Sequence, residues 1–187
     1  MNFNNKESNI SKKDVNTNEF AQLYDKYVKS IYKFIYYKTH HKETAEDLTS
    51  DTFIKALDNF GTFDKKKGQF STWLYQIARN TVIDFYRTKK SNINIDDVWD
   101  LAGDEDIGGD IDTAEKLKDV KKYLKTLKAG QREVVILRVW EGLSYKEIAQ
   151  IIGKTENSCK MMFSRTIQTL RKEMPLGLFL YLIMLGW

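Results

Sequence analysis

The fold of this chain is decided by residues 143–170, which read LSYKEIAQIIGKTENSCKMMFSRTIQTL. Ser144 and Glu147 have the spacing of a capping box, in which each side chain satisfies a free backbone amide at a helix start. The short helix that begins there should end at Gly153, and Thr155 can cap the helix that follows. The stretch therefore predicts two helices joined by a tight glycine turn, which is the layout of a helix-turn-helix.

The second of these helices has an apolar face and a polar face beside it. Its apolar positions recur at spacings of three and four residues and are Cys159, Phe163, Ile167 and Leu170. A helix-turn-helix lays its second helix in the major groove of DNA, where residues near the helix start reach base edges. The residues that we expect to contact DNA lie off the apolar face and are Glu156, Asn157, Lys160, Met161, Ser164 and Arg165. Because the motif is permissive, an ordinary helical hairpin with a solvated face is the alternative.

Amphipathic patterns on the N-terminal side predict more helices. Apolar residues recur at helical spacing from Glu19, after a possible cap at Thr44 and after another at Ser71, so residues 19–91 should form a bundle of three helices. Two further amphipathic segments precede the helix-turn-helix and complete a second bundle over residues 115–174. Proline occurs once and glycines are sparse, which favours helices over strands. The expected fold is all-α, with two small helical bundles.

The segments outside these bundles have distinct compositions. Residues 1–18 are rich in Asn, Lys and Ser and cannot bury enough apolar surface to offset the entropy of ordering, so they should form a disordered arm. Residues 94–112 hold eight acidic residues and no basic one, so residues 92–114 should be a flexible linker that self-repulsion extends.

Residues 175–187 form an uncharged and almost wholly apolar tail. As a helix this tail would span roughly 20 Å, which is too short to cross the hydrocarbon core of a membrane. An exposed apolar patch of this kind is normally an interaction site or an aggregation liability. We therefore expect the tail to fold back onto a bundle or to contact a regulatory partner.

The charge is unevenly distributed along the chain. The formal net charge is +4, and because the acidic segment contributes −8, the rest of the chain carries +12. A basic body of this kind suits a polyanionic partner such as nucleic acid, since neutralised phosphates release counterions. A solvated, lysine-rich helix surface is the alternative that charge alone leaves open.

The reactive residue types argue against catalysis. Cys159 is the single cysteine, which leaves no intrachain disulfide and no cysteine-based metal cluster, and His40 and His41 are the only histidines. No nucleophile, base and orienting group can be assembled from these residues, so we expect no catalytic centre, no metal site, no cofactor and no small-molecule substrate. No basic segment followed by an apolar one opens the chain, and a cytoplasmic location is expected.

Three motifs resemble those of bacterial RNA polymerase sigma factors. Residues 131–134 (QREV), residues 143–149 (LSYKEIA) and the later Lys160 and Ser164-Arg165 resemble sigma region 4, which recognises the minus 35 promoter element. Residues 45–53 (AEDLTSDTF) resemble region 2.2, and residues 70–74 (FSTWL) through Arg79-Asn80 resemble regions 2.3 and 2.4. Their order, with a short acidic linker in place of a further domain, resembles the compact extracytoplasmic-function group.

The resemblance implies roles for residues in the first bundle. It places a docking surface for the largest polymerase subunit on Asp47, Leu48, Ser50, Asp51 and Ile54. It places contacts with the single-stranded minus 10 element, where an exposed aromatic ring could stack on bases, on Lys66, Trp73, Gln76, Arg79, Asn80 and Arg87. The alternatives are helix-start stabilisation for the acids, packing against a neighbouring helix for Trp73, and core packing for each apolar position.

The resemblance also implies partners. They are core RNA polymerase and promoter DNA at the minus 10 and minus 35 elements, with an anti-sigma factor as an optional further partner and the chain a monomer when free. Two other functions remain open from the sequence. One is a helix-turn-helix regulator that binds DNA without polymerase, and the other is a decoy that occupies polymerase without directing initiation.

Overall fold

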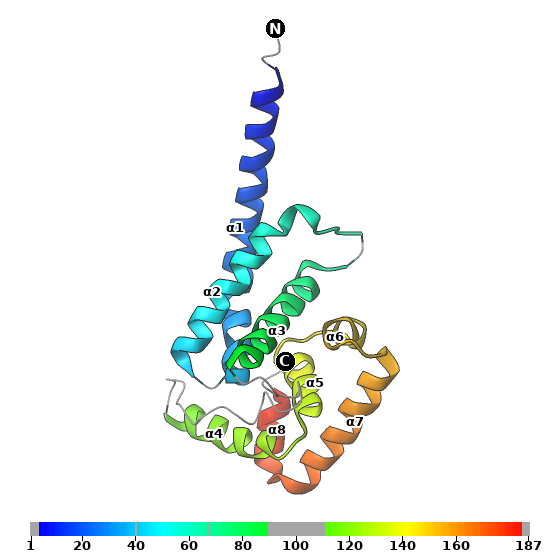
Figure 1. The fold of residues 1–187 in the computed structure, drawn as a ribbon. Helices are drawn as coiled ribbons and strands as arrows, with labels where there is room; N and C mark the ends of the chain where they lie inside the picture. The colour runs from blue at the N-terminus through cyan, green and yellow to red at the C-terminus, as the bar shows by residue number, and fades with distance from the viewer. Residues whose placement is uncertain (1–3, 40, 67, 90–110, 185–187) are drawn as a thin grey trace.

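The computed structural model describes residues 4–39, 41–66, 68–89 and 111–184, and these ranges contain helices and no strands. The first module consists of α1 (Asn4–Thr39), α2 (Lys42–Asp58), the short 3-10 helix η1 (Phe60–Thr62) and α3 (Phe70–Lys89). The second module consists of α4 (Ile111–Lys125), α5 (Ala129–Val139), α6 (Tyr145–Ile152), α7 (Glu156–Glu173) and α8 (Leu176–Met184). The two modules lie against each other (Figure 1), and the expected all-α fold is confirmed.

Helix α1 is longer than the sequence analysis predicted. It begins at Asn4, and Figure 1 shows its first turns projecting beyond the other helices. The prediction of a disordered arm over residues 1–18 is therefore wrong from Asn4 onward. The reason is that the chain has no glycine or proline before Gly61, so a helix nucleated by the packed part of α1 can continue toward the N-terminus.

The start of α2 also differs from the prediction. His41 occupies the N-cap position with extended backbone, and its Nδ1 accepts a hydrogen bond from the backbone amide of Thr44 at 3.2 Å. Thr44, which was expected to cap this helix, therefore lies inside its first turn. His41 has a structural role that the sequence analysis did not assign to it.

The helix-turn-helix forms as predicted. The Ser144 amide donates to Glu147 Oε2 at 2.8 Å, and the Glu147 amide donates to Ser144 Oγ at 3.3 Å, which completes the capping box of α6. Gly153 ends α6 with a φ of 69°, in the left-handed region where a glycine has no steric penalty. The Thr155 hydroxyl then accepts from the Ser158 amide at 3.2 Å and caps α7.

Arg132 holds the junction between α4 and α5. Its side chain is buried and donates to the backbone carbonyls of Leu124, Lys125 and Leu127 at 2.7 to 3.1 Å. The last carbonyls of a helix have no partner within that helix, so a guanidinium can satisfy several of them at once. The arginine of the QREV motif is therefore a structural residue.

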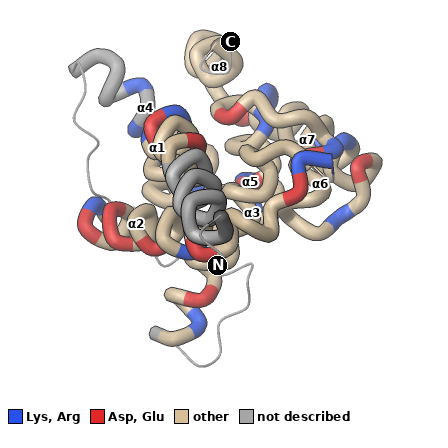
Figure 2. The backbone as a smooth tube through the Cα atoms, turned by 90° about the horizontal axis from the view of Figure 1, so that it is seen from above, with Lys and Arg blue, Asp and Glu red and all other residues tan. Residues whose placement is uncertain are grey.

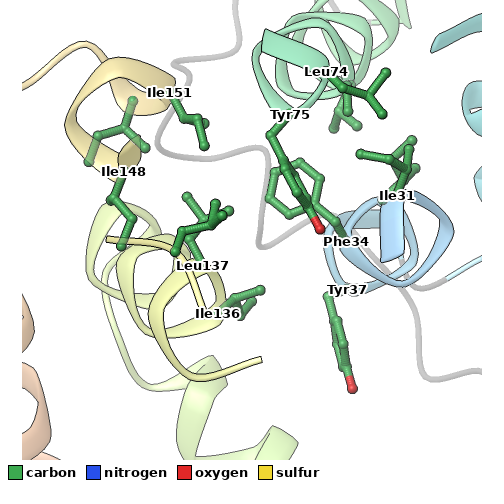
Figure 3. Packing of buried hydrophobic residues seen from close by; sticks show 14 of the residues in the cluster. Ile31, Phe34, Tyr37, Leu74, Tyr75, Ile136, Leu137, Ile148 and Ile151 are labelled. Carbon is green, nitrogen blue, oxygen red and sulfur yellow. The ribbon is translucent and has the colours of Figure 1, made fainter. Parts of the chain in front are cut away.

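The main hydrophobic core passes from one module into the other. Figure 3 shows Ile31 and Leu74 of the first module on one side and Leu137 and Ile148 of the second on the other, with Tyr75 between them. All five side chains are at least 98% buried. The sequence predicted two bundles joined by a linker, and it gave no sign that they share a core.

A second cluster closes the far side of the second module. It includes Val120 of α4, Val135 of α5, Leu170 of α7 and Leu182 of α8. The apolar tail therefore folds back onto its own module, which was one of the two predicted outcomes. Helix α4 begins at Ile111, so residues 111–114 are helical and do not belong to a linker. The rest of the expected linker, residues 92–110, lies outside the described residues.

Candidate nucleic-acid and polymerase interfaces

The predicted minus 35 residues share the outer surface of α7. Glu156, Asn157, Lys160, Met161, Ser164 and Arg165 are all exposed. Three of them line a groove of about 700 Å³ between the N-terminal ends of α5 and α7, and these three are Asn157, Met161 and Arg165. The structure therefore brings the predicted residues together, with their side chains accessible to a ligand.

The same groove contains basic residues that the sequence analysis missed. Lys128 is the N-cap residue of α5, and Lys154 precedes the N-cap of α7. Two helix N-termini therefore meet two lysines and Arg165, which is a suitable environment for an anionic group such as a phosphate. Lysines at or next to helix N-caps were a usable signal, but the packing of α5 against α7 that brings the two N-caps together was not visible in the sequence.

The predicted minus 10 residues lie on α3 and on the connector before it, residues 63–69. Lys66, Asn80 and Arg87 are exposed. Arg87 forms an ion pair with Asp84 at 3.0 Å. An exposed pair of this kind has little energetic value and can rearrange when a ligand arrives.

Trp73 is less exposed than expected. Its ring is half-buried and lies 5.3 Å from the ring of Phe63 and 5.5 Å from that of Phe70, measured between centroids. The connector folds back and supplies Phe63 as a packing partner, so the prediction of an exposed aromatic is only partly correct. The remaining surface of Trp73 lines a groove of about 380 Å³ together with Phe63, Gln76 and, from α6, Gln150.

Arg79 meets a buried carboxylate of the second module. Its Nε lies 3.2 Å from Glu133 Oε1, and the same oxygen lies 2.6 Å from Lys38 Nζ on α1. Glu133 and Lys38 are 4% and 3% exposed, so this cluster is shielded from water. The ammonium of Lys38 also lies 4.8 Å above the ring of Phe34.

Burial and charge have opposite effects on the groups of this cluster. Burial alone would raise the pKa of Glu133, but the charges of Lys38 and Arg79 and their hydrogen bonds outweigh it, so the pKa is lowered and the carboxylate stays ionised. Burial lowers the pKa of Lys38 to about 8, against the opposing effect of Glu133 and with a further lowering from Arg79 and Arg132. Glu133 was not predicted as a site residue.

Other polar contacts connect α3 to the second module. Gln76 Nε2 donates to the backbone oxygen of Gln150 at 2.9 Å, and Thr72 Oγ1 donates to Glu147 Oε1 at 3.3 Å. The Tyr75 hydroxyl donates to Glu141, and burial raises the pKa of both groups. Gln76 and Arg79, two of the predicted minus 10 residues, are therefore engaged by the second module.

The predicted polymerase surface lies on α2. Asp47, Ser50, Asp51 and Ile54 are exposed, and Figure 2 shows acidic residues along this helix. Leu48 is only 4% exposed and belongs to the core, so its prediction as a polymerase contact is wrong. Leu48 follows the fully buried Ala45 by three residues, so both side chains lie on the inner face of α2.

A largely apolar groove runs beside these residues, between α1 and α2. It has a volume of about 990 Å³, and its wall includes Tyr24, Ile54 and Leu57 of the first module and Trp140 of the second. Ile54 and Leu57 are 55% and 50% exposed. The exposure of Leu57 adds an apolar residue to the predicted surface.

Within the described ranges, no group of three or more His, Cys, Asp or Glu side chains could hold a metal ion. Cys159 is fully buried, as predicted for a core residue. No described helix combines the length and the apolar character that spanning a membrane requires.

Two family models match the chain. Sigma-70 region 2 matches residues 23–92, and Sigma-70 region 4 matches residues 117–170. The RNA polymerase sigma factor YlaC of Bacillus subtilis is 32% identical over 157 residues, which cover 81% of this chain and 90% of YlaC. The ECF RNA polymerase sigma factor SigX of the same organism is 30% identical, and the match covers 84% of this chain and 84% of SigX.

Two further similarities extend this result. The ECF RNA polymerase sigma factor BldN of Streptomyces coelicolor is 36% identical over 83% of this chain, which spans only 60% of BldN. Among solved structures, the sigma factor RpoE of Bartonella quintana, crystallised with the anti-sigma factor NepR, matches with a TM-score of 0.66 at 26% identity. That match covers 82% of this chain and 95% of RpoE.

Proposed function

The chain belongs to the extracytoplasmic-function sigma factors of RNA polymerase, and we propose that it directs core polymerase to promoters through three separate surfaces. The first module, region 2, carries a polymerase surface on α2 and a minus 10 surface on α3. The second module, region 4, carries a minus 35 surface on α7. The chain performs no chemistry in this proposal, and it works in the cytoplasm, where polymerase and chromosome meet.

The minus 35 surface is supported by the exposure of all six predicted residues of α7. In this proposal α7 enters the major groove, where Asn157, Lys160 and Arg165 face base edges. Lys128 and Lys154, at the two helix N-termini that border the groove, hold the flanking phosphates. The phosphate contacts fix the register of the helix, and the base contacts supply the sequence preference.

The minus 10 surface is supported by the groove beside Trp73. Its volume of about 380 Å³ and its mixture of aromatic and amide side chains suit one unstacked base of the non-template strand. Stacking of a base on an aromatic ring contributes roughly 1 to 3 kcal/mol, which offsets part of the cost of opening a duplex. Lys66, Asn80 and Arg87 are exposed and would follow the strand.

The polymerase surface is supported by the combination of exposed acids and exposed apolar residues on α2. Asp47 and Asp51 can pair with arginines of the polymerase, and Ile54 and Leu57 can fill apolar contacts. An anti-sigma factor is a further proposed partner, because the matching RpoE structure contains one.

The observation that carries the proposal is the presence of both regions, in order, with an intact helix-turn-helix. The test is reconstitution with purified core polymerase, followed by transcription from promoters selected out of random DNA. Promoter-directed transcripts would support a sigma factor. Specific DNA binding without polymerase association would indicate a helix-turn-helix regulator, and polymerase binding without transcripts would indicate a decoy.

A further inference from the structure

Two cationic side chains of region 2 lie close together, and a carboxylate of region 4 pairs with both. Lys38 of α1 and Arg79 of α3 both approach the same oxygen of Glu133, at 2.6 and 3.2 Å. The cations come from the first module and the carboxylate comes from the second, 54 or more positions away in sequence. The anion is therefore supplied only while the two modules lie together.

A buried pair of like charges needs an anion. Lys38 is nearly inaccessible to water, and each of the two cations destabilises the charged form of the other by repulsion. Removing the anion alone would leave buried positive charge without compensation, which typically costs several kcal/mol. Separation of the modules must therefore either expose these cations to water or provide another anion.

The position of Arg79 indicates which anion that would be. Arg79 precedes Asn80 and lies one helical turn from Gln76, both of which we assign to the minus 10 strand. Gln76 is also engaged by region 4, through the backbone oxygen of Gln150. A phosphodiester resembles a carboxylate in carrying one negative charge over two oxygens, and both form charge-assisted hydrogen bonds with Arg and Lys.

We propose that Lys38 and Arg79 form a binding site for a backbone phosphate of the minus 10 strand, and that Glu133 occupies this site as an internal competitor when region 4 is packed on region 2. This inference rests on the proposed function. It assigns Lys38 to the DNA interface, and it makes Glu133 a residue that couples domain packing to DNA binding. Polymerase, by holding the two regions apart, would free the site for DNA.

The first experiment uses the full chain without polymerase. Fluorescence anisotropy would measure its affinity for a labelled single strand that carries the selected minus 10 sequence. Glu133→Gln keeps the shape of the side chain and removes its charge, and it should tighten binding by about tenfold, or roughly 1.4 kcal/mol. Adding Lys38→Met to this variant should remove the gain. Glu173→Gln, the same charge change at an exposed position of α7, should leave the affinity within about twofold of the unmodified chain.

The second experiment uses the holoenzyme. It does not require a Glu133 variant to fold. The slope of log affinity against log salt is negative. Loss of one phosphate contact by Lys38→Met should make it shallower by about 0.7 for a single strand. An unchanged slope, or no gain in affinity for a folded Glu133→Gln chain, would overturn the inference while leaving the sigma-factor function intact. A chain that gives no promoter-directed transcript with core polymerase would overturn both.

Discussion

Gln76 of α3 and Gln150 of α6 lie 74 positions apart, and the side-chain amide of the first donates to the backbone oxygen of the second at 2.9 Å. This contact places the end of α6 over the groove that we assign to an unstacked base of the minus 10 strand. The packed arrangement of the two modules seen here, the closed arrangement, therefore covers part of the surface that we assign to minus 10 DNA.

Holding the modules together should consequently block minus 10 binding. A Gln76→Cys/Gln150→Cys chain, joined by a cleavable bis-maleimide, should lose most of its affinity for the minus 10 single strand and regain it on cleavage. The comparison is made within one protein, so the loss of the Gln76 side chain affects both measurements equally. The buried thiol of Cys159 should not react, and a chain with Gln150→Cys alone serves as the control. Equal affinities before and after cleavage would show that the closed arrangement does not obstruct DNA.

Local features of the fold could be predicted because their signals lie within a few residues of one another. Ser144, Glu147, Gly153 and Thr155 determine helix starts and ends through contacts that span three or four positions. The accessible face of α7 followed from the same logic, since one apolar stripe leaves the opposite side for solvent or DNA. These parts of the fold agree with the structure, and the six α7 residues predicted to contact the minus 35 element are exposed, while their contact with DNA stays a prediction.

Contacts between the modules could not be predicted in this way. Glu133 lies between Arg132 and Val134, and nothing in that short segment distinguishes it from a solvated acid on a helix surface. Its partner Lys38 is 95 positions away, and its burial depends on the packing of three helices. The cluster became visible only once the positions of α1, α3 and α5 were known.

For Leu48 and Ile54 of α2, the sequence predicted the helix but not which residue is buried. Both are apolar residues of α2, and both were predicted to contact polymerase, yet Leu48 is 4% exposed and Ile54 is 55% exposed. Leu48→Ala should lower the free energy of unfolding by about 2 to 5 kcal/mol, the usual cost of a cavity in a core. Ile54→Ala should leave stability within about 0.5 kcal/mol and weaken binding to core polymerase. Urea unfolding and a polymerase pull-down measure the two effects, and normal polymerase binding by Ile54→Ala would remove this residue from the docking surface.

Helix α8 offers a matched pair for the contribution of the tail. Leu182 is fully buried against α4 and α7, whereas Leu180 is 52% exposed on the same helix. Leu182→Ala should destabilise the chain by about 2 to 5 kcal/mol, and Leu180→Ala should change stability by less than about 0.5 kcal/mol. Similar unfolding midpoints for the two variants would mean that α8 does not stay packed on region 4 in solution.

Arginines on α7 test the minus 35 surface. Arg165 lines the groove between the two helix N-termini, whereas Arg171 is exposed in the last turn of the same helix, outside that groove. Arg165→Ala should reduce the affinity of the holoenzyme for a minus 35 duplex by an amount equivalent to about 1 to 3 kcal/mol. Arg171→Ala should have a much smaller effect at the same salt concentration. Equal losses would indicate general charge attraction instead of a defined site.

The pKa of Lys38 predicts how pH affects the closed arrangement. Burial lowers this pKa to about 8 when the modules are packed, whereas a solvated lysine titrates near 10.5. Between these two values the open chain holds a proton that the closed chain lacks, so closing releases a proton and raising the pH favours the closed arrangement. Below pH 8 the ammonium is protonated in both arrangements, and this contribution to the pH dependence disappears.

Affinity of the free chain for the minus 10 single strand should therefore fall as the pH rises from 8 to 10, by at most about tenfold per pH unit for one proton. Lys38→Arg supplies the matched control, because a guanidinium stays charged throughout this range beside Glu133, Arg79 and Arg132. That variant should bind DNA with little change over the same range. If both proteins show the same decline, then groups other than Lys38 titrate and the buried ammonium does not couple domain packing to pH.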